Sequence, residues 1–258
     1  MSTVWQANTN SIKTFVENVL PRLTFKEPLV LKPNIVSSQP YPVTTDVNLV
    51  EAIIDYLNSI NIFDITIAEG SSDNTMENFK KLGYTKLAKE KSIELIDLND
   101  CDAIPMKNEK ADVLKIFFFP KILTNKFIVS LANLKEHHAA EVTFTLKNMF
   151  GIAPGKYYSH NIRNKPWQKE TLHDLGVKKC VVDIARYRLP DVGVIDGRIA
   201  QLGSEQYGPT KRMDVFLASD NCVALDIVAA KLLGHEKVEY LEKLTQLFNV
   251  KSFNVVDV

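Results

Sequence analysis

The sequence predicts a single α/β domain over residues 1–258, with a mostly parallel Rossmann-like sheet flanked by helices and a second lobe of mixed strands and helices. Two observations support this fold class. Short apolar runs alternate with segments whose apolar residues recur at helical spacing, a pattern typical of right-handed βαβ units. The 258 residues are 45% hydrophobic and 24% charged, which is enough for a large core without disulfides or a structural metal.

The N-terminal half, residues 25–100, is predicted to form a βαβαβ unit. Its strands are expected at residues 28–33 (PLVLKP), 65–68 (ITIA) and 93–98 (IELIDL). The pair Thr45-Asp46 offers N-cap side chains for the first helix, and a glycine followed by Ser and Asp after the second strand favours a turn into another helix.

The second half is predicted to continue with strands at 113–119 and 127–134, a helix over 139–150, and an aperiodic loop over 152–168 that forms a lid or a partner surface. Further elements are listed in chain order: a short helix at 169–175, a strand at 179–184, a hairpin at 192–200 turning at Asp196-Gly197, a strand at 215–218, and helices starting after Ser219-Asp220 and at 238.

Composition excludes several classes of protein. Thirty-one basic and thirty-one acidic residues give no net field to attract nucleic acid or an anionic membrane. The N-terminus does not resemble a signal peptide, and no apolar stretch of about 18 residues is present. Cys101, Cys180 and Cys222 are far apart, so we expect no iron–sulfur cluster of the protein's own and a cytoplasmic location.

Polar residues follow the predicted strands at the edge of the sheet where open α/β proteins bind ligands. Lys32 and Lys135 are candidate anion-binding cations, Glu69 a candidate base and His137 a candidate acid or base. The alternative is that such residues cap helices and face water, and for Ser71 capping is the favoured interpretation. The residues predicted to bind the ligand are Lys32, Asn34, Ser71, Asn148, His160, Glu205, Gly208 and Lys211.

A divalent metal site is a weaker prediction. His137 and Glu141 are four residues apart, as two ligands on one helical face would be, and Asp196 is a further candidate ligand. The complete ligand set of a known metal motif is missing, so a surface hydrogen bond between the histidine and the glutamate is the alternative.

A second polar cluster spans residues 203–212 (GSEQYGPTKR). Its glycines allow backbone N–H groups to converge, and Lys211 and Arg212 add positive charge, so the turn is a candidate cradle for a carboxylate or phosphate. A wide hairpin loop with solvated basic residues is the alternative. The sequence contains no P-loop, no GxGxxG and no GxSxG motif.

Several of these motifs together resemble the uncharacterised family catalogued as domain of unknown function 362, over roughly residues 28–234. The motifs are KPN (32–34), AEGS (68–71), SLANLKEHH (130–138), LKNMFGIAPGKYYSH (146–160), VVDI (181–184), IDG (195–197), GSEQYGPT (203–210) and ASDNCVALDIVAAKLLG (218–234). Many members of that family carry an attached four-iron ferredoxin-like module, whose cysteine run this chain lacks. The polar positions that match the family are Lys32, Asn34, Glu69, Lys135, His137, Lys147, Asn148, His160, Asp196, Glu205, Asp220 and Asp226. Of these, Asp226 lies within a helical stripe and is a candidate structural partner of a buried backbone group or lysine.

We therefore expect an enzyme that acts on an anionic small molecule, with His137, Lys135 and Glu69 as catalytic residues and a divalent metal as a candidate cofactor. One alternative is a redox-linked accessory protein that works with a separate ferredoxin-like partner. The other is a non-catalytic metabolite-binding protein. We expect neither nucleic acid nor membrane as a partner.

Overall fold

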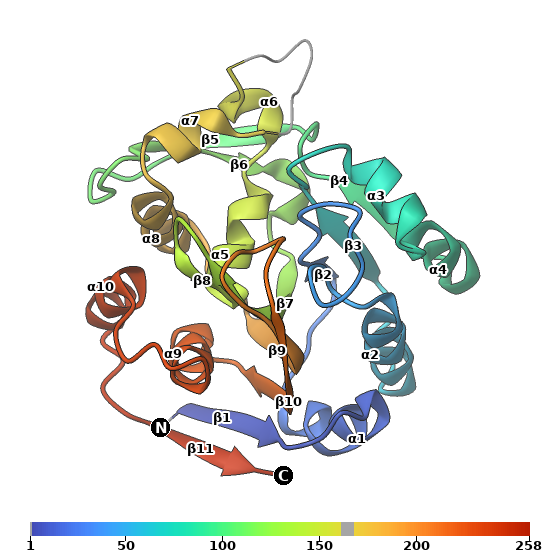
Figure 1. The fold of residues 1–258 in the computed structure, drawn as a ribbon. Helices are drawn as coiled ribbons and strands as arrows, with labels where there is room; N and C mark the ends of the chain where they lie inside the picture. Colours follow the sequence, from blue (N-terminus) through green and yellow to red (C-terminus); the bar gives the residue numbers. More distant parts are fainter. Residues whose placement is uncertain (1, 161–167) are drawn as a thin grey trace.

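A computed structural model describes residues 2–160 and 168–258, and it confirms the predicted α/β class with a large, mostly parallel sheet (Figure 1). The strand order is β11-β1-β10-β9-β7-β2-β3-β4, and β8 pairs with β7. The strands of this sheet are β1 (Ser2–Ala7), β2 (Leu29–Pro33), β3 (Ile65–Glu69), β4 (Glu94–Asp97), β7 (Phe127–His137), β8 (Glu141–Thr143), β9 (Val192–Gln201), β10 (Thr210–Ser219) and β11 (Phe253–Asp257).

Helices cover both faces of the sheet, and each face has its own hydrophobic core (Figure 1). The helices α1, α2 and α4 pack on one face, and α8, α9 and α10 pack on the other. The helices are α1 (Ile12–Asn18), α2 (Val47–Ser59), α3 (Thr75–Lys81), α4 (Tyr84–Lys91), α5 (Thr145–Asn148), α6 (Gly155–Tyr158), α7 (Glu170–Asp174), α8 (Val177–Tyr187), α9 (Cys222–Leu232) and α10 (Glu239–Leu247), with short 3-10 turns η1 (Leu20–Arg22), η2 (Lys121–Leu123) and η3 (Met149–Ile152).

The parallel part of the sheet is β9-β7-β2-β3-β4. Leu31 on β2 pairs with Val129 on β7 and with Ile67 on β3, so the carboxyl ends of these three strands lie at one edge. A separate two-stranded antiparallel sheet, β5 (Ala103–Lys107) with β6 (Ile116–Pro120), lies near α6 and α7 at the top of Figure 1.

The prediction of a strand at 179–184 is wrong, because this segment belongs to α8. The six residues KCVVDI form an apolar run too short to distinguish a strand from a helix. Over the longer window, Val177, Cys180, Val181 and Ile184 are buried at the spacing of one helical face.

The predicted hairpin turn at Asp196-Gly197 is also wrong, because both residues lie within the continuous strand β9. The hairpin is formed by β9 and β10, which the loop 202–209 connects. Asp196 is fully buried and bonds to Arg198 and to the Tyr41 hydroxyl. Arg198 also lies 2.8 Å from Asp46, the N-cap of α2. Because Arg198 neutralises the charge of Asp196, the dipeptide Asp196-Gly197, which is typical of turns, can lie inside a strand.

The prediction of a helix over 139–150 is wrong as well. The chain instead turns after β7 into β8, and only Thr145–Asn148 is α-helical before η3. His137 and Glu141 are therefore cross-strand neighbours in a hairpin rather than residues one helical turn apart. Strands β1 and β11, which pair in parallel at one edge of the sheet, were not predicted from the sequence.

Candidate functional site

The carboxyl ends of β2 and β3 bring Lys32 and Glu69 into direct contact. The ammonium of Lys32 lies 2.9 and 3.0 Å from the two carboxylate oxygens of Glu69 and 2.9 Å from Oδ1 of Asn148. Lys32 is 1% and Glu69 is 2% exposed. Burial lowers the pKa of Lys32, and the charge and hydrogen bond of Glu69 oppose that shift.

Backbone groups complete this network. The N–H groups of Ile35 and Gly70 donate to Glu69 at 3.0 and 2.7 Å, and Asn34 Nδ2 donates to Asn148 Oδ1 at 3.0 Å. Gly151 leaves the necessary space, because a Cβ there would lie 2.3 Å from a Glu69 oxygen and 2.8 Å from the Lys32 ammonium. We call Lys32, Glu69 and Asn148 the Lys32 network.

Three further lysines surround the same edge of the sheet. Lys135 at the end of β7 donates to the Val43 carbonyl at 2.7 Å, and Lys169 donates to the carbonyls of Gly70 and Gly151 at 2.7 and 3.2 Å. Lys147 on α5 has its ammonium 4.4 Å from the centre of the Phe150 ring. Within residues 2–160 and 168–258 the Lys147 ammonium has no hydrogen-bond acceptor and no ion-pair partner.

Burial is the main cause of the low basicity of these amines. It lowers the pKa of Lys135 and Lys169 to about 7 and that of Lys147 to about 8. Lys32 lowers the pKa of all three further, whereas Glu69 acts in the opposite direction. Lysines whose amines titrate this close to neutral pH are suited to proton transfer or to nucleophilic attack.

A cavity of about 100 Å³ opens among these groups, and we call it the lysine cavity. Two polar atoms in its lining, Asn34 Oδ1 and Ser71 Oγ, are buried and have no hydrogen-bond partner in the described part of the chain. The lining residues include Asn34, Glu69, Ser71, His137, Lys147, Asn148, Lys169, His173 and Glu205.

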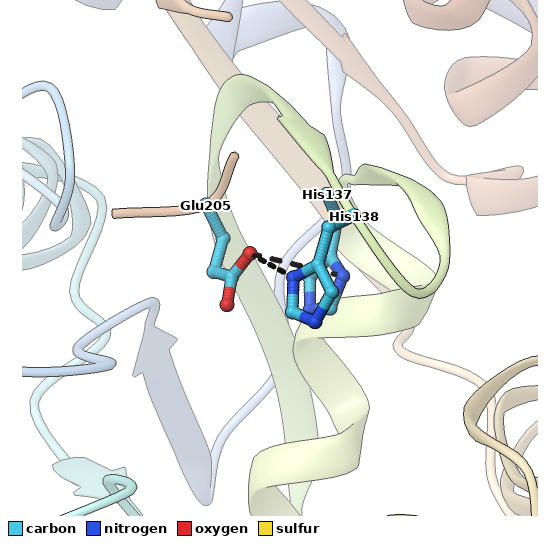
Figure 2. Close-up of side chains that lie close together, drawn as sticks. All are labelled: His137, His138 and Glu205. Atoms are coloured by element: carbon cyan, nitrogen blue, oxygen red, sulfur yellow. Dashed lines mark hydrogen bonds and ion pairs between the residues drawn. The ribbon is translucent and has the colours of Figure 1, made fainter. Parts of the chain in front are cut away.

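The hairpin loop between β9 and β10 brings Glu205 back to the end of β7, where it meets two histidines (Figure 2). Nδ1 of His138 lies 3.0 Å from a Glu205 oxygen, and Nδ1 of His137 lies 3.9 Å from it. The two imidazole rings stack with centroids 5.1 Å apart. Burial would raise the pKa of Glu205, but His137 and His138 lower it to about 2.

His137 has a defined tautomer. Its Nδ1 accepts hydrogen bonds from the backbone N–H groups of Ala139 and Ala140 at 3.1 and 3.2 Å. Burial, together with the charge of Lys147, lowers the pKa of His137 to about 3. The ring is therefore neutral at pH 7, with its proton on Nε2.

The metal ligands predicted around His137 are not brought together. Glu141 pairs with Lys178, and Asp196 is engaged by Arg198 and Tyr41, so neither lines the cavity. The structure instead groups His137, His138 and Glu205, each of which offers one ligand atom within 4.8 Å of the others. The helical spacing assumed for His137 and Glu141 does not exist, because both residues are in strands.

Four residues predicted to bind the ligand, Lys32, His160, Gly208 and Lys211, also lie outside the cavity lining. Lys32 contacts two lining residues, Glu69 and Asn148. His160 is exposed and lies 3.2 Å from a carboxylate oxygen of Asp174. The Gly208 carbonyl accepts a hydrogen bond from Gln201, and Lys211 is exposed on β10. Of the glycine-rich turn, only Glu205 and Gln206 reach the cavity. Residues 161–167 of the predicted loop 152–168 lie outside the described residues.

The predicted catalytic, ligand-binding and metal residues did not include Lys147, Lys169, His138 or His173. Lys147 was visible as a polar position within the family-like segment LKNMFG, next to Asn148. Lys169 carried no signal, because it follows an aperiodic segment and reaches the site through a left-handed backbone conformation (φ 54°). These residues show that the cations of the cavity come from α5 and the start of α7 as well as from strand ends.

No helix of the described residues has both the length and the apolar composition needed to cross a membrane. The chain shares 29% identity over 108 residues with the thylakoid-associated protein sll1697 of Synechocystis sp.. That alignment covers 41% of this chain and 32% of the relative. No solved structure matches. The model of the domain of unknown function DUF362 matches residues 29–231, and the chain therefore belongs to this family.

Proposed function

We propose that the protein is an enzyme that acts on a small anionic molecule bound in the lysine cavity. The observation that carries this proposal is Lys147, a desolvated amine in the cavity lining with no acceptor in the described part of the chain. A buried charge without a partner is costly, and an anion in the cavity would supply the partner.

The charge and size of the site favour a small anion. Four lysines surround the site, whereas two carboxylates, those of Glu69 and Glu205, line the cavity. The volume of about 100 Å³ is below the roughly 300–1,000 Å³ of pockets for drug-sized ligands. We infer a ligand of the size of a small carboxylate or phosphate, or the anionic group of a larger molecule.

The residues have distinct roles in this proposal. Lys147 and Lys169 bind the anion and exchange protons with it, because their amines titrate near neutral pH. His137 donates an Nε2 hydrogen bond as a neutral ring. Glu69 holds Lys32 in place, and Lys135 adds positive charge from behind the cavity lining.

The binding step is tested by titration calorimetry with oxalate and inorganic phosphate as probes. Lys147→Met should weaken the binding of the tighter probe at least tenfold, because a hydrogen bond to a charged group contributes about 1.5–3 kcal/mol. Lys89→Met is the matched control, since Lys89 is exposed on α4. Equal affinities of the two variants, or no binding of either probe to the unmodified protein, would contradict the proposal.

A divalent metal beside the cavity is a second candidate, favoured by the grouping of His137, His138 and Glu205. Two imidazoles and one carboxylate suit Zn²⁺ or Mn²⁺, and the Nδ1 atoms of His137 and His138 lie 3.9 and 3.0 Å from one oxygen of Glu205.

The metal is tested by equilibrium dialysis against Zn²⁺ or Mn²⁺ followed by elemental analysis. We expect about one equivalent in the unmodified protein and at least a tenfold weaker site in His138→Ala. His160→Ala is the control, because that histidine is exposed and pairs with Asp174 rather than with Glu205. Equal metal content in His138→Ala and the control would contradict the site.

The cytoplasm is the location we propose, because the three cysteines are free thiols, as in a reducing compartment. The ferredoxin-like partner and the non-catalytic role stay predictions. Mass spectrometry of small molecules that co-purify with the protein would separate metabolite binding from an accessory role.

A further inference from the structure

We propose that Lys147 forms an imine with the carbonyl carbon of a small 2-oxo acid held in the lysine cavity. This inference rests on the proposed function, and it specifies the substrate class and the nucleophile.

The amine of Lys147 is available to react, unlike those of Lys32 and Lys169. Lys32 donates to Glu69 and Asn148, and Lys169 donates to two backbone carbonyls. Lys147 differs from both, because its ammonium lies against the face of the Phe150 ring and has no acceptor in the described part of the chain. Its nitrogen is therefore the one lysine nitrogen of the cavity lining that is not committed to a described protein contact.

Lys147 also reaches the protonation state that attack on a carbonyl requires. An amine attacks only in its neutral form, which an ordinary lysine rarely adopts at neutral pH. Burial, together with the charge of Lys32, lowers the pKa of Lys147 to about 8. A substantial fraction of the amine is then neutral under mildly basic conditions, whereas Glu205 and Glu69 keep the ammonium form accessible for binding.

The cavity lining also offers partners for the carboxylate and the carbonyl oxygen of a 2-oxo acid. An ammonium has three N–H donors, and Lys169 uses two of them on the Gly70 and Gly151 carbonyls, which leaves one for a substrate carboxylate. Ser71 Oγ is an unpartnered hydroxyl that would donate to the carbonyl oxygen. Asn34 Oδ1 is an unpartnered acceptor that would receive the hydroxyl of the carbinolamine.

The step balances without an external oxidant or reductant. The Nζ lone pair forms a C–N bond to the carbonyl carbon, and the resulting carbinolamine loses its oxygen as water. Both protons of that water derive from the amine, through exchange with neighbouring groups. The imine then withdraws electrons from the adjacent carbon, so the site would favour reactions that break a bond to that carbon.

Reductive trapping tests the inference on the complete chain. The protein is incubated with pyruvate and sodium cyanoborohydride at about pH 8, and intact-mass and peptide-mapping spectra are recorded. The reagent delivers hydride to the imine carbon, so the modified protein gains the mass of one pyruvic acid less one oxygen atom. We expect one such addition, located at Lys147.

Two variants serve as controls. Lys147→Arg keeps the positive charge but has no primary amine, so the fraction of protein that carries the addition should fall at least tenfold. Lys89→Arg should be labelled like the unmodified protein, because Lys89 is exposed on α4. Equal labelling of Lys147→Arg, or label spread over surface lysines, would overturn the inference.

The outcomes separate this inference from the proposed function. If oxalate binds and the binding depends on Lys147 while pyruvate gives no addition at Lys147, the imine is wrong and the anion site stands. If the addition occurs at Lys147 and excess oxalate suppresses it, both are supported.

Discussion

The Lys32 network and Lys147 show two ways in which this protein buries a lysine. Lys32 is matched by Glu69 and Asn148, and Glu69 in turn receives two backbone N–H groups. Lys147 lies in the lining of the lysine cavity, which Glu69 and Asn148 also line, and the described neighbour of its ammonium is an aromatic ring. A buried lysine whose hydrogen bonds are all satisfied holds its neighbours in place, whereas a buried amine without an acceptor gains one when an anionic ligand binds. The difference separates the supporting residues of the site from the reacting ones.

The largest expected effect comes from breaking the satisfied member of this pair. Glu69→Gln replaces an oxygen acceptor with an amide that faces the Lys32 ammonium and two backbone N–H donors. Loss of one partner of a buried ion pair costs about 3–5 kcal/mol, so the free energy of unfolding in urea should fall by that amount. The exposed Glu77→Gln is the matched control and should change it by less than about 0.5 kcal/mol. Equal stability of the two variants would show that the Lys32 network is not structural.

A smaller effect should distinguish Lys147 by its dependence on pH. In the folded protein its pKa is lowered to about 8, compared with 10.5 for an ordinary lysine. Between these values the unfolded chain binds more protons than the native one, so the stability of the unliganded protein rises with pH. The contribution of one group cannot exceed about 1.4 kcal/mol per pH unit.

Chemical denaturation at about pH 8 and pH 9.5 measures this slope. Lys147→Met should reduce the rise in stability but not abolish it, because the pKa of Lys169 is lowered as well. Lys89→Met should leave the slope unchanged. Anion affinity should change in the opposite direction and fall above about pH 8, as the binding cation loses its proton. A slope in Lys147→Met equal to that of the control would contradict the assignment.

The parallel half of the fold could be predicted because its strands are short apolar runs between clear turn and cap signals. The predicted strands at 28–33, 65–68 and 93–98 correspond to β2, β3 and β4. The prediction at 179–184 was wrong because burial on one helical face gives a dense apolar run that a short window cannot interpret. The hairpin turn predicted at Asp196-Gly197 was wrong because the partner that satisfies Asp196 inside the strand, Tyr41, is 155 residues away in sequence.

The part of the site that lies at the strand ends could also be predicted from the sequence. The rule that ligands bind at strand carboxyl ends pointed to Lys32, Glu69 and His137, which the fold brings to one place. Lys147 and Lys169 escaped assignment because their positions depend on tertiary packing of α5 and on the backbone path before α7, neither of which has a local signature.

The two carboxylate oxygens of Asp46 accept hydrogen bonds from two different elements. Oδ1 accepts the N–H of Asn48 at the start of α2, and Oδ2 accepts from Arg198 in the middle of β9. Rotation of α2 about its axis would break the second contact without touching the first. Asp46 thereby fixes the orientation of α2 relative to β9. An asparagine at position 46 would preserve the hydrogen bond at the start of α2 but lose the ion pair with Arg198.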